Sequence, residues 1–198
     1  MSLKSNIIES INIRKKLLLE EKKIKIIVDK IYKTFLEDKK ILICGNGGSA
    51  ADAEHLSTEY IVRLKKKNNR VPIKMFSLTF NMATITATAN DYSYNDIFSR
   101  NLEALGDAGD LLLVLSTSGN SKNIISVLKK AKSKKISTMG WLGCGGGLAK
   151  KFCDYNLIIK SNSTARIQEE HKFLGHYIFD IVEDMLIKSG KINLKKNI

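Results

Sequence analysis

The sequence changes character at residues 40–49, which read KILICGNGGS: a short apolar run ends in glycines, an asparagine and a serine. An apolar run of this length that stops at turn-forming residues is typical of a buried β-strand. The residues that follow, 49–66, are expected to form a helix. This stretch therefore predicts a strand, a tight turn and a helix in direct succession.

Strands and helices are expected to alternate to the end of the chain. Short apolar runs predict further strands at 73–78, 111–115, 137–142 and 156–159. Helices are expected at 82–90, 97–105, 123–132 and 164–189. The alternation predicts an α/β fold, with a parallel sheet covered by helices on both faces. Ligands of such folds bind at the carboxyl ends of the strands, so the residues just after each strand are the candidates for a site.

Residues 5–38 precede the first strand and have helical periodicity. Ile24, Ile27, Ile31 and Phe35 recur at three- and four-residue spacing, which predicts one apolar helix face. Residues 13–19 carry a second apolar face, with a break between the two. We expect one domain, 1–198, in which residues 1–38 form a helical extension. We also expect the apolar stripe to be incompletely buried by one chain and to pack against another subunit.

The net charge of +13 raises the question of a nucleic-acid partner. The lysines cluster near the ends of expected helices, at 65–67, 129–135 and 188–196, where the helix dipole favours cations. No aromatic residues alternate with them to stack on bases. We interpret them as solvated helix ends whose field attracts an anionic substrate, and expect no nucleic-acid partner.

The cysteines and the hydropathy bear on the compartment. Cys44, Cys144 and Cys153 are odd in number and lack zinc-binding spacing, which favours free thiols in a reducing cytosol. No apolar stretch resembles a signal peptide or is long enough to cross a membrane. These features predict a cytoplasmic protein without a membrane partner.

A run of hydroxyl side chains follows the expected strand 111–115. Residues 116–121 read STSGNS and lead into a helix. Unpaired backbone N–H groups and the helix dipole make such a terminus favourable for an anion. One serine would suffice as a helix cap, so we favour a phosphate-binding loop over a simple cap. The loop 45–49, GNGGS, lacks the dinucleotide and Walker spacings and is a weak signal by itself.

A polar stripe runs along the helix after that glycine loop. Asp52, His55, Glu59 and Arg63 are spaced by three and four residues, which places them on one helix face. A solvated face is the simplest explanation of such a stripe. The neighbouring ligand loop and the histidine favour a functional site instead.

His55 and Glu59 also have the one-turn spacing of metal ligands. With Gln168 and His176 of the last expected helix they make a donor set that could bind Zn²⁺. Glutamine is an uncommon zinc ligand, so composition by itself gives a weak indication. We interpret His171, which points away from His176, as a surface residue.

Four motifs together resemble a known family, the phosphoheptose isomerases within the sugar isomerase (SIS) domain proteins. They are CGNGGSAADAEH at 44–55, ANDY at 89–92, STSGNS at 116–121 and ARIQE at 165–169. Their order and separations also match, and the resemblance covers almost the whole chain. It implies a doubly wound, flavodoxin-like, five-stranded parallel sheet and a homotetramer with shared active sites. It further implies conversion of sedoheptulose 7-phosphate to D-glycero-D-manno-heptose 7-phosphate by enediol proton transfer, for surface polysaccharide.

The resemblance assigns roles to individual residues. It implies Glu59 and His176 as the acid/base pair and one Zn²⁺ per subunit on His55, Glu59, Gln168 and His176. The implied substrate-binding residues are Asn46, Gly47, Gly48, Ser49, Glu59, Arg63, Asn90, Asp91, Ser116, Thr117, Ser118, Ser121 and Gln168.

Two places depart from the family pattern. Ala165 stands where some members carry an acidic residue, and residues 143–147, GCGGG, carry a cysteine among glycines with no assigned role. The main alternative function is a non-catalytic SIS scaffold that binds the replication initiator protein. A sugar-phosphate sensor is a third, weakened because no DNA-binding segment is attached.

Overall fold

The computed structural model describes residues 2–195 and contains a five-stranded, fully parallel sheet in the order β2-β1-β3-β4-β5. The strands are β1 (Ile41–Gly45), β2 (Met75–Ser77), β3 (Leu111–Ser116), β4 (Ser137–Leu142) and β5 (Tyr155–Ile158). This order is that of a doubly wound, flavodoxin-like sheet, so the expected fold class is confirmed.

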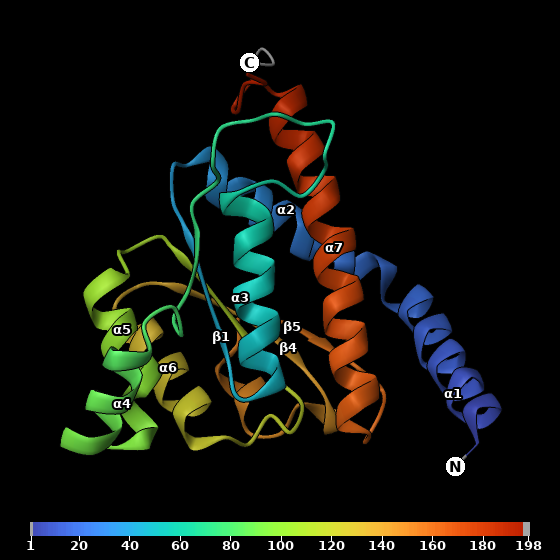
Figure 1. Ribbon diagram of the computed structural model, residues 1–198, viewed down its shortest axis with the longest axis horizontal. Coiled ribbons are helices and arrows are strands. Elements are labelled where there is room, and N and C mark those ends of the chain that lie inside the picture. Colours follow the sequence, from blue (N-terminus) through green and yellow to red (C-terminus); the bar gives the residue numbers. More distant parts are fainter. Residues whose placement is uncertain (1, 196–198) are drawn as a thin grey trace.

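Helices cover both faces of the sheet, as Figure 1 shows. One face carries α2 (Glu21–Leu36), α3 (Gly48–Ile61) and α7 (Thr164–Lys188), and the other carries α4 (Met82–Asp91), α5 (Ile97–Leu105) and α6 (Lys122–Ser133). Single-turn helices η2, η3 and η4 cover Tyr94–Asp96, Cys144–Gly146 and Ala149–Phe152. None of the described helices combines the length and the hydropathy that a bilayer crossing requires.

Strands β1 and β3 are buried at every position because each side chain faces one of two cores. In β1, Ile41 and Ile43 belong to the core under α2, α3 and α7, whereas Leu42 and Cys44 belong to the core under α4, α5 and α6. Successive strand residues point to opposite faces, so a sheet covered twice needs apolar residues throughout. This explains the continuous apolar run at 41–44.

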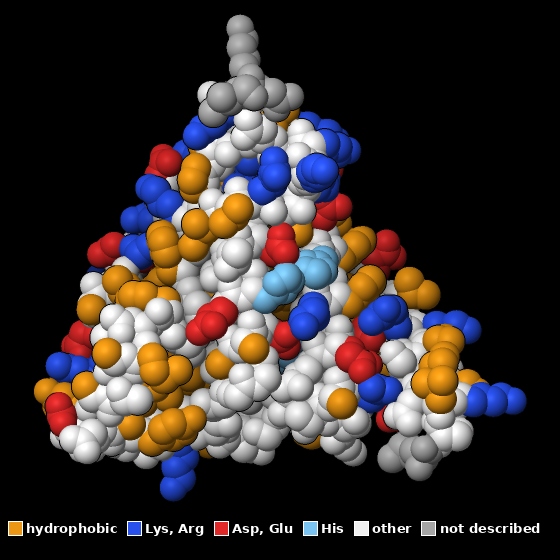
Figure 2. All heavy atoms as spheres, in the orientation of Figure 1, with side chains coloured by type: hydrophobic (Ala, Val, Ile, Leu, Met, Phe, Trp, Pro, Cys, Tyr) orange, Lys and Arg blue, Asp and Glu red, His pale blue; other side chains and the backbone are white. Residues whose placement is uncertain are grey.

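The N-terminal segment is α1 (Leu3–Lys16), the short 3₁₀ helix η1 (Leu17–Glu20) and α2, which confirms the expected break. The expectation that the stripe on α2 faces another subunit is wrong. Ile27 and Ile31 are 1% and 0% exposed within one chain, because α2 packs against α7 and the sheet. Apolar side chains of α1 and η1 remain exposed instead (Figure 2): Leu3, Ile7, Ile8, Ile11, Leu18 and Leu19.

His171 corrects a second expectation, since it is fully buried rather than at the surface. Neither ring nitrogen has a hydrogen-bond partner among the described residues. Burial lowers the pKa of His171 to about 3, so its imidazole is neutral at physiological pH. Its helix face is the buried one, shared with Ile167 and Leu174.

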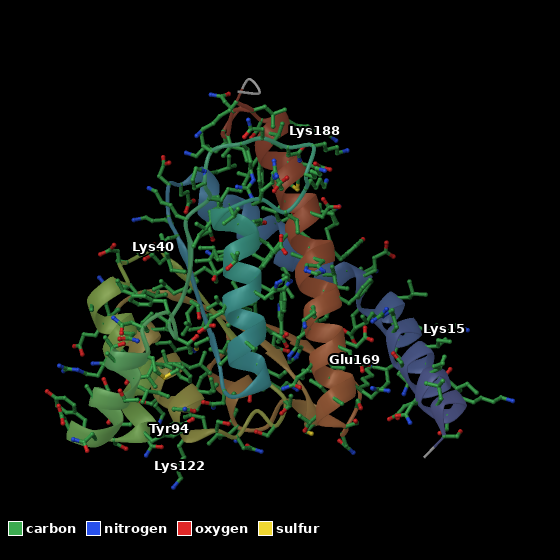
Figure 3. The ribbon with its side chains drawn as sticks, in the orientation of Figure 1. Lys15, Lys40, Tyr94, Lys122, Glu169 and Lys188 are labelled. Carbon is green, nitrogen blue, oxygen red and sulfur yellow. The ribbon has the colours of Figure 1, made fainter. Side chains whose placement is uncertain are left out.

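The two ends of the sheet carry different loops. Lys40, which precedes β1, marks the amino end, whereas Tyr94 and Lys122 lie together at the opposite, carboxyl end (Figure 3). The glycine and serine loops of the sequence, 45–49 and 116–121, lie at that carboxyl end because they follow β1 and β3. β1 and β3 are neighbours, so the two loops adjoin at the switch point of the sheet.

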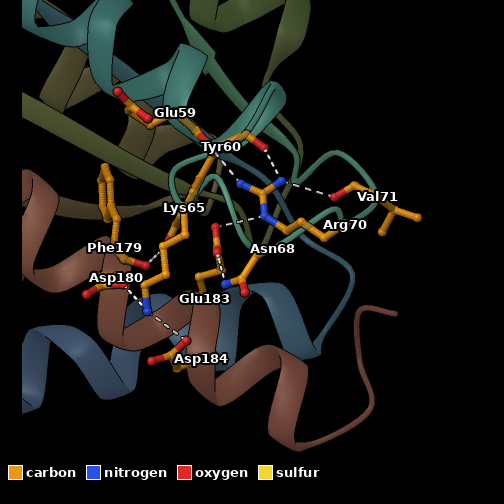
Figure 4. Close-up of polar contacts among 10 residues, drawn as sticks. All are labelled: Glu59, Tyr60, Lys65, Asn68, Arg70, Val71, Phe179, Asp180, Glu183 and Asp184. Carbon is orange, nitrogen blue, oxygen red and sulfur yellow. Dashed lines mark hydrogen bonds and ion pairs between the residues drawn. The ribbon is translucent and has the colours of Figure 1, made fainter. Parts of the chain in front are cut away.

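A buried ion pair holds the far end of α3 to α7 (Figure 4). The Arg70 and Glu183 side chains are both 0% exposed, and Arg70 Nε lies 2.8 Å from Glu183 Oε2. Arg70 also donates to the carbonyls of Glu59 and Tyr60, at 2.9 and 2.8 Å. These carbonyls are in the last turn of α3 and lack helical partners, so the guanidinium ends the helix there.

We predict that Arg70→Met lowers the free energy of unfolding by about 3–5 kcal/mol, because Glu183 is left charged and unpaired in the core. Urea unfolding measures this. Adding Glu183→Gln removes the orphan charge and keeps an acceptor for Asn68, so the double variant should recover part of the loss. Lys33→Met, which removes a solvent-exposed pair with Glu37, should cost about 1 kcal/mol or less. A double variant as unstable as Arg70→Met would contradict this account.

Candidate active site

The serine loop, residues 116–121, is shaped by its own hydroxyl groups. Ser116 Oγ accepts from the Gly119 N–H at 3.0 Å, and Ser118 Oγ accepts from the Asn120 N–H at 3.1 Å. Ser121 is the N-cap residue of α6, but its side chain makes no capping hydrogen bond. At the start of α6 the Ile124 N–H is bound by Asn123 Oδ1, but Ser121 caps none of the other N–H groups, and the positive dipole end there favours an anion.

The glycine stretch 143–147, which has no role in the sequence pattern, supports the serine loop. Gly119 has φ +65°, and a Cβ added there would lie 2.1 Å from the Gly146 carbonyl oxygen. The Ala149 N–H donates to the Gly119 carbonyl at 2.8 Å, and the Leu148 N–H donates to Asn120 Oδ1 at 2.9 Å. The two loops pack backbone to backbone, which requires glycine on both sides.

Gln168 lies against the first turn of α3. A Cβ added to Gly48 would lie 2.5 Å from Gln168 Nε2, so a side chain at this position would displace the Gln168 amide. Ala165 and Lys172 line the same hollow as Gln168. Asp52, in the second turn of α3, is buried and pairs with Lys172 Nζ at 3.2 Å. Asp52 is thus held in an ion pair with a residue of α7.

Three of the four expected metal ligands come together between α3 and α7. His55 Nε2 lies 2.8 Å from His176 Nε2 and 3.5 Å from Glu59 Oε1. One ligand atom from each residue lies within 4.8 Å of the others. Figure 2 shows pale blue histidine side chains near the centre of this face of the molecule.

The donor set suits a zinc ion. Zn–N and Zn–O bonds of about 2.0–2.2 Å place tetrahedral ligand atoms about 3.3 Å apart, close to the separations found here. Two imidazoles and one carboxylate also leave a fourth position for water or substrate, as in catalytic zinc sites. His55, Glu59 and His176 therefore fit such an ion.

Gln168 lies at another level of α7 than His176. It precedes His176 by eight residues on α7, which is about 12 Å of helix rise. Its amide contacts Gly48, whereas His176 contacts His55, two turns further along α3. Within one chain, Gln168 therefore lies beside the first turn of α3, whereas His176 lies beside His55, about two turns further along.

The remaining expected residues lie around the carboxyl end of the sheet or at the surface. Asn90 and Asp91 are exposed at the end of α4, where Asn90 Nδ2 donates to Asp91 Oδ1 at 2.8 Å. Ser49 is buried in the first turn of α3. Arg63 is exposed and lies beyond the end of α3, because the helix stops at Ile61 rather than at residue 66.

The structure also adds residues that sequence patterns did not single out. Asn123 and Tyr94 both bond to Asn46, which joins the glycine loop to α6 and η2. Asn120 joins the serine loop to the loop after β4. The only sequence signal for Asn120 and Asn123 is their place in and beside the serine motif.

Comparison with known proteins identifies the family. Residues 8–143 match the SIS domain family. A phosphoheptose isomerase of Clostridium acetobutylicum is 42% identical over 187 residues, which cover 93% of this chain and 94% of that protein. The chain belongs to the SIS-domain phosphoheptose isomerase family. It is accordingly an enzyme, an isomerase of sugar phosphates.

Solved structures agree with the fold and the family. Phosphoheptose isomerases from Neisseria gonorrhoeae and Francisella tularensis superpose with TM-scores of 0.86 and 0.87, at 32% and 30% identity. Each comparison covers 92% of this chain, with 97% and 96% of the respective structures. The SIS match ends just after β4, so the expected domain boundaries, 1–198, stay a prediction.

We predict that Gly119→Ala weakens binding of inorganic phosphate at least tenfold, because its methyl group would displace the loop from Gly146. Isothermal titration measures this. Gly145→Ala is the matched control: its φ is also positive, at +74°, but a Cβ there would meet no atom within 4 Å. The control should lose less affinity. Equal phosphate affinity in Gly119→Ala and the unchanged protein would show that the serine loop does not hold the anion.

Proposed function

We propose that this enzyme converts sedoheptulose 7-phosphate to D-glycero-D-manno-heptose 7-phosphate, a heptose precursor for surface polysaccharide. The proposal is carried by one observation: the same fold holds a hydroxyl-rich helix start, where Ser121 makes no capping bond, and a His–Glu–His group. The first suits a phosphate and the second suits proton transfer next to a carbonyl. The names of the relatives support the seven-carbon substrate.

The proton movements of an aldose–ketose exchange match the side chains present. Glu59, a half-buried carboxylate, takes a proton from C1 of the ketose and returns it to C2. His176 gives a proton to the C2 oxygen and takes one from the C1 oxygen, so that the carbonyl moves from C2 to C1. One hydrogen thus passes between carbons and one between oxygens, and no redox cofactor is consumed.

A zinc ion held by His55, Glu59 and His176 would supply Lewis-acid polarisation of the carbonyl. If His176 Nε2, which faces His55, held the ion, only Nδ1 of this ring would be left to exchange protons. The ligand role and the base role of Glu59 can be divided between its two carboxylate oxygens. Oε1 faces His55 at 3.5 Å, which leaves the other oxygen for the substrate proton. Glu59 would be a weaker base in this arrangement than a free carboxylate, because part of its charge is shared with the ion.

Within one chain, Gln168 is separated from the other three expected zinc ligands. This separation favours an assembly in which subunits share active sites. Gln168 and the His55–Glu59–His176 group lie two helical turns apart, so a Gln168 that reaches this group would come from another subunit. Apolar side chains exposed on α1 and η1, among them Ile7 and Leu18, offer a surface for that contact. We propose a homotetramer assembled in this way.

The charge and the thiols of the chain fit the same proposal. An excess of 13 positive charges gives a field that attracts an anionic sugar phosphate. Free cysteines, of which Cys44 is buried and Cys144 exposed, suit a reducing compartment, so we place the reaction in the cytoplasm. The scaffold alternative gains no support from the relatives described above, which are isomerases by name.

We predict that Glu59→Gln lowers kcat at least 100-fold while substrate binding persists, because the amide keeps the shape but cannot accept the proton. Conversion of sedoheptulose 7-phosphate by the purified protein measures this. Glu54→Gln is the control, since Glu54 lies on the same helix and only bonds to Thr79 Oγ1. Turnover within a few-fold of the unchanged protein in Glu59→Gln would exclude Glu59 as the base.

A further inference from the structure

A reciprocal pair of side-chain amides joins the glycine loop to α6. Asn46 Nδ2 donates to Asn123 Oδ1 at 2.9 Å, and Asn123 Nδ2 donates back to Asn46 Oδ1 at 2.8 Å. Asn46 follows β1, whereas Asn123 is in the first turn of α6 and is only 2% exposed. The pair therefore connects the two loops that meet at the switch point of the sheet.

The backbone fixes which way this pair points. The Ile124 N–H donates to Asn123 Oδ1 at 2.9 Å. Reversing the Asn123 amide would bring its NH₂ group against that N–H, so that two donors would face each other. Asn123 must therefore present its oxygen here, and Asn46 must present its NH₂ group to that oxygen.

Tyr94 occupies the remaining acceptor position of Asn46. Its hydroxyl donates to Asn46 Oδ1 at 3.2 Å, beside the bond from Asn123. An amide oxygen has two lone pairs, and both now have a donor. The second N–H of the Asn46 amide is the group left for a ligand, and Asn46 keeps part of its surface exposed.

We propose that Asn123 is a positioning residue that makes Asn46 a hydrogen-bond donor toward the substrate. The substrate group that meets Asn46 is then an acceptor, a hydroxyl or carbonyl oxygen of the sugar phosphate. Asn123 touches no substrate itself and acts through Asn46. The inference rests on the proposed function for the sugar and for its contact with Asn46, whereas the amide geometry is independent of both.

A double-mutant cycle tests the proposal. Asn46→Ala and Asn123→Ala should each lower kcat/KM for sedoheptulose 7-phosphate about tenfold, the effect of one lost substrate hydrogen bond. The double variant should be no worse than Asn46→Ala, because Asn123 acts only through Asn46. Losses that multiply would overturn the proposal.

A matched control separates positioning from stability. Asn101 is a buried asparagine of α5 whose Nδ2 donates to the Leu78 carbonyl at 2.7 Å. Asn101→Ala should lower Tm much as Asn123→Ala does, with kcat/KM unchanged. An equal loss of kcat/KM in both variants would reduce Asn123 to a purely structural role. If Asn123→Ala does not fold, Asn123→Asp keeps the shape but places a second oxygen against Asn46 Oδ1, and the same loss is expected.

A readout without turnover distinguishes failure of this inference from failure of the proposed function. The side-chain NH₂ signals of Asn46 can be assigned in ¹H–¹⁵N NMR spectra by their absence in Asn46→Ala. They should shift strongly in Asn123→Ala and stay in place in Asn101→Ala. Unmoved Asn46 signals in Asn123→Ala would overturn the inference even in an active enzyme. Absence of turnover by the unchanged protein would instead overturn the proposed substrate.

Discussion

The parallel packing of α3 against α7 is the constraint on which the candidate site depends. Successive contacts advance along both helices together: a Cβ on Gly175 would lie 2.4 Å from Leu56, and Tyr60 donates to the Phe179 carbonyl at 3.1 Å. His176 directly follows that glycine and so meets His55. A shift by one helical turn, about 5.4 Å, would separate the two imidazoles. The chemistry of the site is thus set by helix register.

A second constraint acts at the carboxyl end of the sheet, where backbone approaches backbone. The order of the strands brings the loops after β1 and β3 together, and the loop after β4 supports them through Gly119 and Gly146. Side-chain hydrogen bonds add to these backbone contacts. The most important is the Asn46–Asn123 pair, which joins the loop after β1 to α6. The two loops are therefore held mainly by hydrogen bonds, whereas the His55–Glu59–His176 group is held by helix packing.

Local patterns in the sequence predicted the elements but not the contacts that end or cover them. The strands at 111–115 and 137–142 and the helix at 97–105 agree with the structure to within one residue. The helix expected to reach residue 66 stops at Ile61, because Arg70 binds its last carbonyls from a loop that no periodicity reveals. His171 was misplaced for a similar reason: a helix pattern shows which residues share a face, not which face another element covers. The motif groups Gln168 with His176, and within one chain the two residues lie at different levels of α7.

The central claim is that the His55–Glu59–His176 group, carrying one zinc ion, is the reacting centre of a sedoheptulose 7-phosphate isomerase. The most direct test measures zinc content and turnover on the same samples of the assembled enzyme, after chelation and during stepwise return of zinc. The account predicts that turnover rises in proportion to bound zinc and levels off at one ion per subunit, and that His176→Ala prevents both. Full turnover in a sample stripped of metal would contradict it.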